Sequence, residues 1–383
     1  MEKRTLYRPS FTECHLAAIG PPAVMAQEAA AAVFADMAAA MVSGGIEPIG
    51  QKVHGPWHER QRVLAARQDA LRAAGLDREL PCTFVAGRPD GPQGPVCAQL
   101  WGIAAVAAGT SVATLELPAG GRGRLLSAPG LRLLWIGSID GADERGRVAG
   151  PPTPQAERML ANAEAALAAG GFGLPDVVRT WIHLRQILEW YDDFNAVRTA
   201  FFGARGITGA PGGHPFPAST AVQGTSGEGA CVMDLLAVQA SSPDAIGSVP
   251  HTCRQPSPFA YGSAFSRASY LDLDGARTVF VSGTASVGPD GRSLHAGDRE
   301  GQIREALDGI CAVLDPLGAG LQDLGPGTLY AADAETLRAY ELLAGRGQIP
   351  GLPLVPVLAD ICRPDLRVEI EAVALVPGTG RRT

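Results

Sequence analysis

From residue 131 onward the sequence presents the same order of expected elements twice. The first copy begins with a strand at residues 131–140 and a helix at 155–170, and the second begins with a strand at 276–286 and a helix at 299–318. Each copy continues with an Asp-containing turn, a further strand, a second helix and a closing pair of strands. A repeated supersecondary unit restricts a chain to a tandem arrangement of like units. The repeat predicts an α+β fold of two tandem β-α-β-α-β-β units, each with a leading hairpin, in which helices cover mixed sheets.

Residues 1 to about 130 are less regular than the repeat. They contain an Ala-rich stretch from Ala23 to Val42, which we expect to form a helix or a helix pair, and a polar helical stretch from Trp57 to Ala74. His54 and His58 are four residues apart, but a Gly-Pro pair between them breaks the helix that a metal site of this spacing needs. We therefore predict an N-terminal extension packed on the core and no metal site.

Composition and charge exclude several classes of protein. The chain has 383 residues, of which 46% are hydrophobic and 19% charged, so it can bury a sizeable core. A net charge of −7 and a sequence pI near 5.6 argue against nucleic acid as a partner. The seven cysteines are scattered without a C-x-x-C pair, and no glycine-rich loop has the context of a phosphate cradle. We expect a cytoplasmic protein without a membrane partner, a metal or another cofactor.

The strand from Arg367 to Leu375 carries two carboxylates on one face. Alternation places Glu369 and Glu371 together, opposite a face of small and aliphatic residues. Two like charges on a covered face repel, so one of them tends to take up a proton, and a carboxylic acid can act as a general acid. An edge strand with two solvated glutamates is the alternative. Cys362 and Arg363, a short distance upstream, favour a site.

The two copies differ at this strand. Aligning V-M-D-L-L-A-V of the first copy with V-E-I-E-A-V-A of the second puts Met233 opposite Glu369 and Leu235 opposite Glu371. On this alignment the first copy has lost both carboxylates. We therefore expect residues 1–130 to form the N-terminal extension, residues 131–245 a degenerate, structural first unit, and residues 246–383 a second unit that carries the active site.

Several segments of the repeat resemble a known family. The first copy, with D-V-V-R-T-W-I-H-L, Y-D-D-F-N-A-V-R-T-A-F-F and F-P-A-S-T-A-V, resembles the RidA/YjgF family of small trimeric α+β proteins, as does the closing V-E-I-E-A-V-A of the second. Two such units behind some 130 further residues resemble the layout of the chorismatases. The segment A-D-I-C-R-P-D-L-R-V-E-I-E resembles their active-site strand. The resemblance implies two tandem RidA/YjgF-like units with threefold packing of sheets, as in a homotrimer.

The resemblance also implies an activity. A chorismatase cleaves the enolpyruvyl ether of chorismate without a cofactor, by protonation of the terminal methylene carbon. The branch that this chain resembles gives pyruvate and 3-hydroxybenzoate and is a 3-hydroxybenzoate synthase of secondary metabolism. One alternative is the hydrolytic chorismatase, which gives pyruvate and a dihydroxycyclohexadiene carboxylate. A second is a RidA-like protein that binds a ligand without catalysis or hydrolyses imines. Ser219 stands where the imine-hydrolysing proteins have an arginine, which disfavours that last activity.

The resemblance assigns roles to residues of the second copy. Glu369 matches the general acid, and a cysteine at the position of Cys362 resembles the branch that forms 3-hydroxybenzoate, although a buried core cysteine is the alternative. Arginines fork onto carboxylates, so Arg363 and Arg267 are the candidates for holding a dianionic substrate. The other expected substrate-binding residues are Tyr261, Ser263, Phe265, Gly283, Thr284, Ala285 and Glu371.

Overall fold

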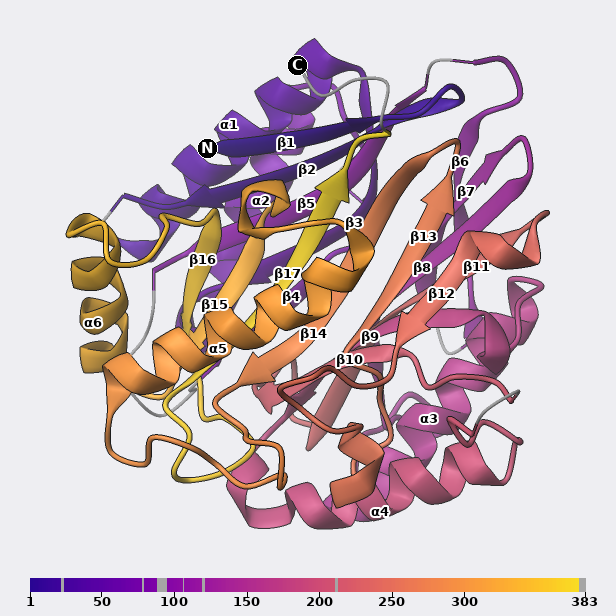
Figure 1. Ribbon diagram of the computed structural model, residues 1–383. Helices are drawn as coiled ribbons and strands as arrows, with labels where there is room; N and C mark the ends of the chain where they lie inside the picture. The colour runs from indigo at the N-terminus through magenta and orange to yellow at the C-terminus, as the bar shows by residue number, and fades with distance from the viewer. Residues whose placement is uncertain are drawn as a thin grey trace.

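The computed structural model describes residues 1–21, 24–77, 79–87, 95–105, 107–118, 121–210 and 213–378. The strands form three mixed sheets, and two helices cover each sheet (Figure 1). The strand orders are β1-β2-β5-β3-β4, β10-β9-β11-β8-β7-β6 and β12-β13-β14-β17-β15-β16. The predicted α+β fold, with mixed sheets covered by helices, is confirmed.

The elements fall into three groups along the chain. The first comprises β1 (Glu2–Tyr7), β2 (Phe11–Ile19), α1 (Ala26–Gly44), β3 (Ile46–His54), α2 (Arg60–Ala73), β4 (Thr83–Val85) and β5 (Cys97–Ala105). The second comprises β6 (Ser111–Glu116), β7 (Arg122–Ala128), β8 (Leu131–Asp140), α3 (Pro152–Ala169), β9 (Val177–Leu184), α4 (Ile187–Gly203), β10 (Ala218–Gln223) and β11 (Cys231–Ala240). The third comprises β12 (Ile246–Val249), β13 (Ala268–Leu273), β14 (Ala276–Ala285), α5 (Arg299–Leu314), β15 (Gly327–Ala331), α6 (Ala334–Gly345), β16 (Leu354–Leu358) and β17 (Val368–Val376). Short 3₁₀ turns lie at Trp57–Glu59, Leu174–Asp176, Pro243–Ala245, Pro258–Tyr261, Asp315–Leu317 and Leu321–Asp323.

The two copies predicted from the repeat form where the sequence places them. The strand β8 spans residues 131–140, and both copies follow the order β-α-β-α-β-β. The leading hairpins are present, because β7 pairs antiparallel with β8 and β13 pairs antiparallel with β14. Asp298 begins α5 as its N-cap, with a carboxylate oxygen that accepts a hydrogen bond from the Gly301 amide at 2.9 Å.

The N-terminal region is a third copy of the same unit. Its elements run β2, α1, β3, α2, β4 and β5, and its sheet order matches that of β13-β14-β17-β15-β16 strand for strand. In every copy the two strands that follow the helices pair in parallel, as β3 with β4, β9 with β10 and β15 with β16. The sequence predicts only an extension here, because an Ala-rich helix and a three-residue strand carry little periodic signal. The strands β6 and β7, which the sequence groups with that extension, belong to the second sheet. The domain boundaries at residues 130 and 245 stay a prediction.

The helices lie at the periphery and the free faces of the three sheets pack against one another (Figure 1). Each sheet has its own core with its two helices. A further core joins all three sheets, with Phe11 and Ile103 from the first, Trp135 and Leu236 from the second and Phe280 from the third. The resemblance implies that three sheets pack together as in a homotrimer, whereas here the three sheets of one chain already pack together. The homotrimer of such chains stays a prediction.

Arg8, in the turn between β1 and β2, joins the first unit to the third. Its side chain is fully buried, and its guanidinium donates hydrogen bonds to the carbonyls of Leu273 and Ala276, both at 2.9 Å, and to the Thr278 hydroxyl at 2.8 Å. The carboxylate of Glu13 lies 3.4 Å from the same group. The Arg8–Glu13 ion pair of the first unit is therefore held in place by hydrogen bonds to the third unit.

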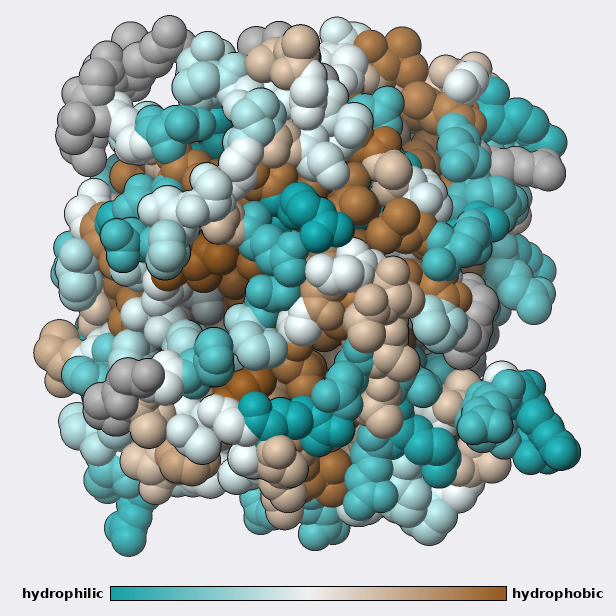
Figure 2. Space-filling model, turned by 90° about the vertical axis from the view of Figure 1, so that its right-hand side faces the viewer, coloured by the Kyte–Doolittle hydropathy of each residue, from teal (hydrophilic) through white to brown (hydrophobic). Residues whose placement is uncertain are grey.

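On the face seen in Figure 2, hydrophilic and hydrophobic residues are interspersed. None of the helices in the described ranges is both long enough and apolar enough to cross a membrane.

Candidate active site

A pocket of about 100 Å³ lies between the second and third units. Helix α4 and strand β10 form its wall on the second unit. On the third unit the wall consists of β14, β17 and the segments that precede β13 and β17. An acid, a thiol, three arginines and two tyrosines meet there: Glu369, Cys362, Arg198, Arg267, Arg363, Tyr191 and Tyr261.

Glu369 is the buried acid of this pocket, whereas Asp192 of its lining is exposed. It lies on β17, which is paired with β14 and β15 in the sheet interior, and it is only 5% exposed. Burial raises its pKa to about 8, and the negative charge of Glu371 adds to the effect. The charges of Arg179 and Arg267 oppose this rise without cancelling it, and within the described part of the chain no lysine or arginine nitrogen lies within 4.0 Å of the carboxyl group. Glu369 is therefore protonated at neutral pH, as the strand pattern predicts for one of the two glutamates.

Glu371 has the opposite environment. Its carboxylate accepts hydrogen bonds from Arg179 at 2.7 Å and from the Tyr330 hydroxyl at 2.9 Å, and the Lys52 ammonium lies 3.6 Å away. Burial alone would raise its pKa, but the charges of Lys52 and Arg179, with hydrogen bonds from Thr220 and Tyr330, outweigh burial and hold the pKa at about 2. One acid of the pair is thus kept charged beside one kept neutral.

Three arginines surround the pocket and can hold an anionic substrate. Arg198 is 2% exposed and donates hydrogen bonds to the Asn195 side chain at 2.7 Å and to the Ser219 hydroxyl at 3.4 Å. Arg267 is 3% exposed and donates to the Tyr261 hydroxyl at 2.7 Å. Arg363 is anchored by a hydrogen bond to a backbone carbonyl and lies over the Tyr261 ring, 5.5 Å from its centroid. Their side chains are oriented by these contacts before any ligand binds.

Cys362 lines the same pocket. Burial raises the pKa of its thiol to about 12, and the proximity of Glu369 adds to the effect, while a hydrogen bond with Tyr191 opposes it. The side chain is therefore a neutral thiol at neutral pH. In this form Cys362 can form hydrogen bonds and shape the pocket. It is poorly suited to nucleophilic attack, which requires a thiolate.

Most residues that the sequence proposes as a site come together in this pocket. Its lining includes Glu369, Cys362, Arg363, Arg267, Tyr261, Ser263, Phe265, Gly283 and Ala285. Two of the predicted residues lie elsewhere. The Thr284 methyl group faces Gly309 of α5, because alternation along β14 turns it to the helix side. Glu371 faces a second cavity where the three sheets meet.

Four residues of α4 also line the pocket without being predicted from the sequence: Asp192, and the three polar residues Tyr191, Asn195 and Arg198. The last three share one side of the helix. They follow the i, i+4, i+7 spacing of a single helix face, and that spacing is the signal that could have found them. The sequence predicts a structural role for the first copy, so none of its polar residues is among the predicted site residues. Ser219 stands where the imine-hydrolysing proteins have an arginine. Arg198 of α4 donates a hydrogen bond to Ser219, so an arginine from a different element lies beside this position.

The structure also corrects the alignment of the two copies by one residue. In the second copy, Glu371 of β17 pairs with Thr328 of β15. The residue of the first copy equivalent to Thr328 is Trp181 of β9, and it pairs with Asp234 of β11. Asp234 and Glu371 both line the cavity where the sheets meet. The first copy has therefore kept one of the two carboxylates. The strand β11 is buried on both faces over most of its length, so its sequence lacks the alternation that would fix the alignment.

In the ranges that the structure describes, no group of three or more His, Cys, Asp or Glu side chains is placed to hold a metal ion.

Comparison with known proteins places this geometry in context. No protein-family model matches the chain. A 3-hydroxybenzoate synthase of Streptomyces hygroscopicus is 31% identical over an alignment of 227 residues; the match covers 53% of this chain and 65% of that protein, slightly less than two thirds of the relative. A solved chorismatase structure superposes with a TM-score of 0.60 at 18% identity and covers 97% of this chain and 99% of its own. The YjgF gene product of E. coli covers 34% of this chain and 98% of its own at 23% identity, with a TM-score of 0.26. The chain has the fold of a chorismatase, and its resemblance to the chorismatase family is confirmed.

Proposed function

We propose that this protein cleaves chorismate to pyruvate and 3-hydroxybenzoate. The observation that carries the proposal is a carboxylic acid kept protonated at neutral pH, Glu369, in a pocket with three buried or anchored arginines. Chorismate carries two carboxylates and an enol ether, so it needs cations to hold it and an acid to cleave it. The similarity to a 3-hydroxybenzoate synthase and to a chorismatase supports the same substrate.

In the proposed reaction Glu369 donates its proton to the terminal methylene carbon of the enolpyruvyl group, which produces an oxocarbenium ion. The arginines hold the two carboxylates, and the pocket keeps the methylene near the acid. The neighbouring ring hydroxyl then attacks the ring carbon that carries this group and loses its proton, while the bond from that carbon to the ether oxygen breaks and pyruvate leaves. Rearrangement and loss of a ring proton give 3-hydroxybenzoate and pyruvate, and the products together contain the same atoms as chorismate. Water attack would instead add one water molecule and give the dihydroxycyclohexadiene carboxylate.

The proposal is tested by incubating the protein with chorismate and following pyruvate and ring products together by chromatography. Equal amounts of pyruvate and 3-hydroxybenzoate would support it. Pyruvate with the dihydroxycyclohexadiene carboxylate would assign the hydrolytic reaction, and no consumption of chorismate would leave a RidA-like binding protein. Sedimentation of the same sample would test the expected homotrimer.

Cys362 is proposed to favour the aromatic product. Replacing it by Ala removes the neutral thiol from the pocket without disturbing a charge. We expect the Cys362→Ala variant to form 3-hydroxybenzoate more slowly or to divert chorismate to the hydrolytic product, measured as the ratio of the two ring products. An unchanged ratio and rate would reduce Cys362 to a packing residue.

Gly283 leaves the space that the Glu369 carboxyl group occupies. A Cβ atom at this position would lie 1.8 Å from Glu369 Oε1 and 3.1 Å from the Thr220 methyl carbon. The end of the Glu369 side chain can rotate away, so we expect Gly283→Ala to fold but to lose about 10²-fold in kcat, since a displacement near 1 Å has such a cost. Pyruvate release and the melting temperature measure the two effects.

The control for this variant is Gly345→Ala, at the end of α6, where a Cβ atom would meet nothing within 4 Å. It should keep the full rate. A Gly283→Ala protein with the wild-type rate would show that the position of the Glu369 carboxyl group is not critical.

Glu371 is expected to set the pH range of the reaction. Its charge raises the pKa of Glu369, so Glu371→Gln should lower that pKa. The rate requires protonated Glu369 and falls as pH rises through its pKa. The alkaline limb of the kcat/KM profile, which reports the pKa of the free enzyme, should therefore move down from about pH 8. From Coulomb's law at protein-like dielectric constants we expect a shift of about one pH unit or more. An alkaline limb that stays in place in Glu371→Gln would contradict this role.

A further inference from the structure

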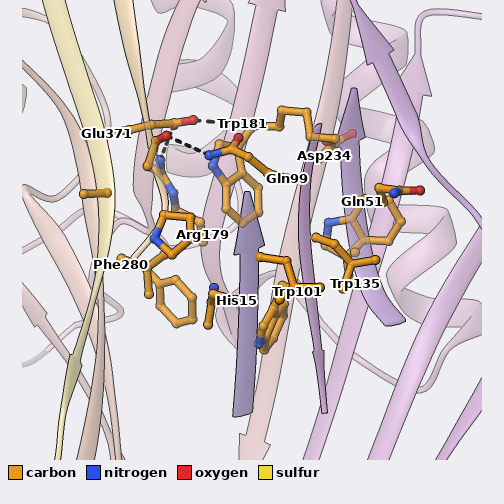
Figure 3. Close-up of a pocket in the computed structure, with 18 residues that line it drawn as sticks. His15, Gln51, Gln99, Trp101, Trp135, Arg179, Trp181, Asp234, Phe280 and Glu371 are labelled. Carbon is orange, nitrogen blue, oxygen red and sulfur yellow. Dashed lines mark hydrogen bonds and ion pairs between the residues drawn. The ribbon is translucent and has the colours of Figure 1, made fainter. Parts of the chain in front are cut away.

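A second cavity, of about 90 Å³, lies where the three sheets meet (Figure 3). Its walls come from all three units, with Lys52 from the first, Arg179 and Trp181 from the second and Phe280 and Glu371 from the third. It is separate from the Glu369 pocket, whose lining residues are all different. We call it the central cavity. At roughly 10–15 Å³ for each water molecule, it has room for about six waters or a ligand of similar size.

Two buried cations in the central cavity have hydrogen-bonding capacity to spare. Arg179 is 2% exposed; its Nη2 atom donates to Thr220 and Glu371, but Nη1 is buried without a hydrogen-bond partner among the described residues. The Lys52 ammonium, in a side chain 10% exposed, has Glu371 at 3.6 Å and otherwise lies over the Trp181 ring, 4.9 Å from its centroid. An unpaired donor on a buried guanidinium is costly unless something accepts from it. The cavity thus offers N–H donors to an acceptor group.

The rest of the lining is aromatic. Trp101, Trp135, Trp181 and Phe280 line the cavity together with Arg179 (Figure 3). The buried Nε1 atom of Trp101 also has no hydrogen-bond partner in the described ranges. Aromatic walls beside cations match a ligand with an apolar body and one acceptor end.

The charges limit what that acceptor end can be. Glu371 and Asp234 also line the cavity, so a multiply charged anion such as phosphate would meet two carboxylates. The Oδ1 atom of Asp234 accepts hydrogen bonds from the Thr83 hydroxyl at 2.6 Å and the Ser138 amide at 2.8 Å. A single carboxylate with a short hydrocarbon tail satisfies both the donors and the aromatic walls.

We propose that the central cavity is a second binding site, for a small monocarboxylate held by Arg179 and Lys52 with its hydrocarbon part against Trp101 and Phe280. This site is independent of the proposed cleavage of chorismate. Its occupant would bind next to Glu371, which connects it to the Glu369 pocket through the strand that both glutamates share.

Tryptophan fluorescence of the full-length protein tests the site, because three of the five tryptophans line the central cavity. Propionate is the probe, and propionamide is its neutral counterpart of the same shape. We expect a saturable change with propionate, with a dissociation constant in the millimolar range. Propionamide and phosphate should each bind at least about tenfold more weakly.

Two variants of the cavity and one control locate the signal. Lys52→Met removes a cation, and Val373→Phe fills space at a partly buried lining residue without a change of charge; each should weaken propionate binding by about tenfold or more. Arg363→Met removes a cation from the Glu369 pocket and should leave propionate binding unchanged. Circular dichroism confirms that each variant is folded.

The proposal is overturned if propionate causes no saturable change, or if propionamide or phosphate binds equally well. Binding that survives both Lys52→Met and Val373→Phe but is lost in Arg363→Met would place the ligand in the Glu369 pocket and would also overturn it.

Discussion

Replacing Glu369 by Gln is expected to lower the rate of pyruvate formation from chorismate by about 10²–10⁴-fold, the usual contribution of a general acid. The amide has the shape of the acid but cannot deliver a proton to the methylene carbon. The substitution places a neutral group where a neutral group already lies, since the pKa of Glu369 is about 8, so the fold should tolerate it. The measurement is kcat at pH 7 with the variant's unfolding temperature determined alongside.

The matched control for this variant is Glu335→Gln, a glutamate on α6 whose side chain is 62% exposed. It should leave the rate unchanged. In the wild-type protein the rate should be constant below pH 8 and fall as pH rises through about 8, where Glu369 loses its proton. A Glu369→Gln protein that keeps more than about a tenth of the wild-type rate would remove Glu369 from its proposed role.

Replacing Arg8 by Met is expected to destabilise the protein by about 3–5 kcal/mol, the cost of breaking a buried ion pair from one side. The variant loses the hydrogen bonds to the third unit and leaves the Glu13 carboxylate buried without its arginine. Urea denaturation at pH 7 measures the change in the free energy of unfolding. Arg62→Met is the control, because Arg62 pairs with Glu59 at the surface with 67% of its side chain exposed, and such pairs contribute about 0–1 kcal/mol.

The same pair predicts a pH dependence of stability. Burial alone would raise the pKa of Glu13, but its hydrogen bond with His15 and the charge of Arg8 outweigh burial and lower the pKa to about 2. A carboxyl group with a lowered pKa stabilises the fold above its unfolded pKa, and that contribution is lost as pH falls toward the folded value. The difference between wild type and Arg8→Met should therefore be largest near neutral pH and shrink below about pH 4. A difference under about 1 kcal/mol at pH 7 would show that the ion pair does not hold the units together.

The sequence predicted the repeat well because its signal is local. The strand β8 and the alternation along β17 follow from residues that are neighbours in the chain. The same alternation identified Glu369 and Glu371 as a pair on one face. It could not tell that Glu369 would enter one pocket and Glu371 another, because that depends on which unit packs over each part of the strand.

The N-terminal unit shows what could not be predicted from the sequence. Its helix α1 is rich in alanine and its strand β4 has three residues, so neither carries a strong periodic pattern. Only the sheet order reveals that it repeats the other two units. The one-residue error that hid Asp234 has a similar cause, because β11 is buried on both faces and its mostly apolar sequence lacks a clear alternation.

By itself the sequence therefore determined the elements of the two later units, their repeat and the acid strand with its nearby Cys362 and Arg363. Tertiary structure alone decided that Arg198 of the second unit would meet Glu369 of the third, and that Lys52 and Arg179 would keep Glu371 charged. The physical reason is that periodicity records which face of an element is buried, whereas the partner of that face is selected by the packing of three sheets against one another. The different protonation of two glutamates two residues apart is a property of that packing.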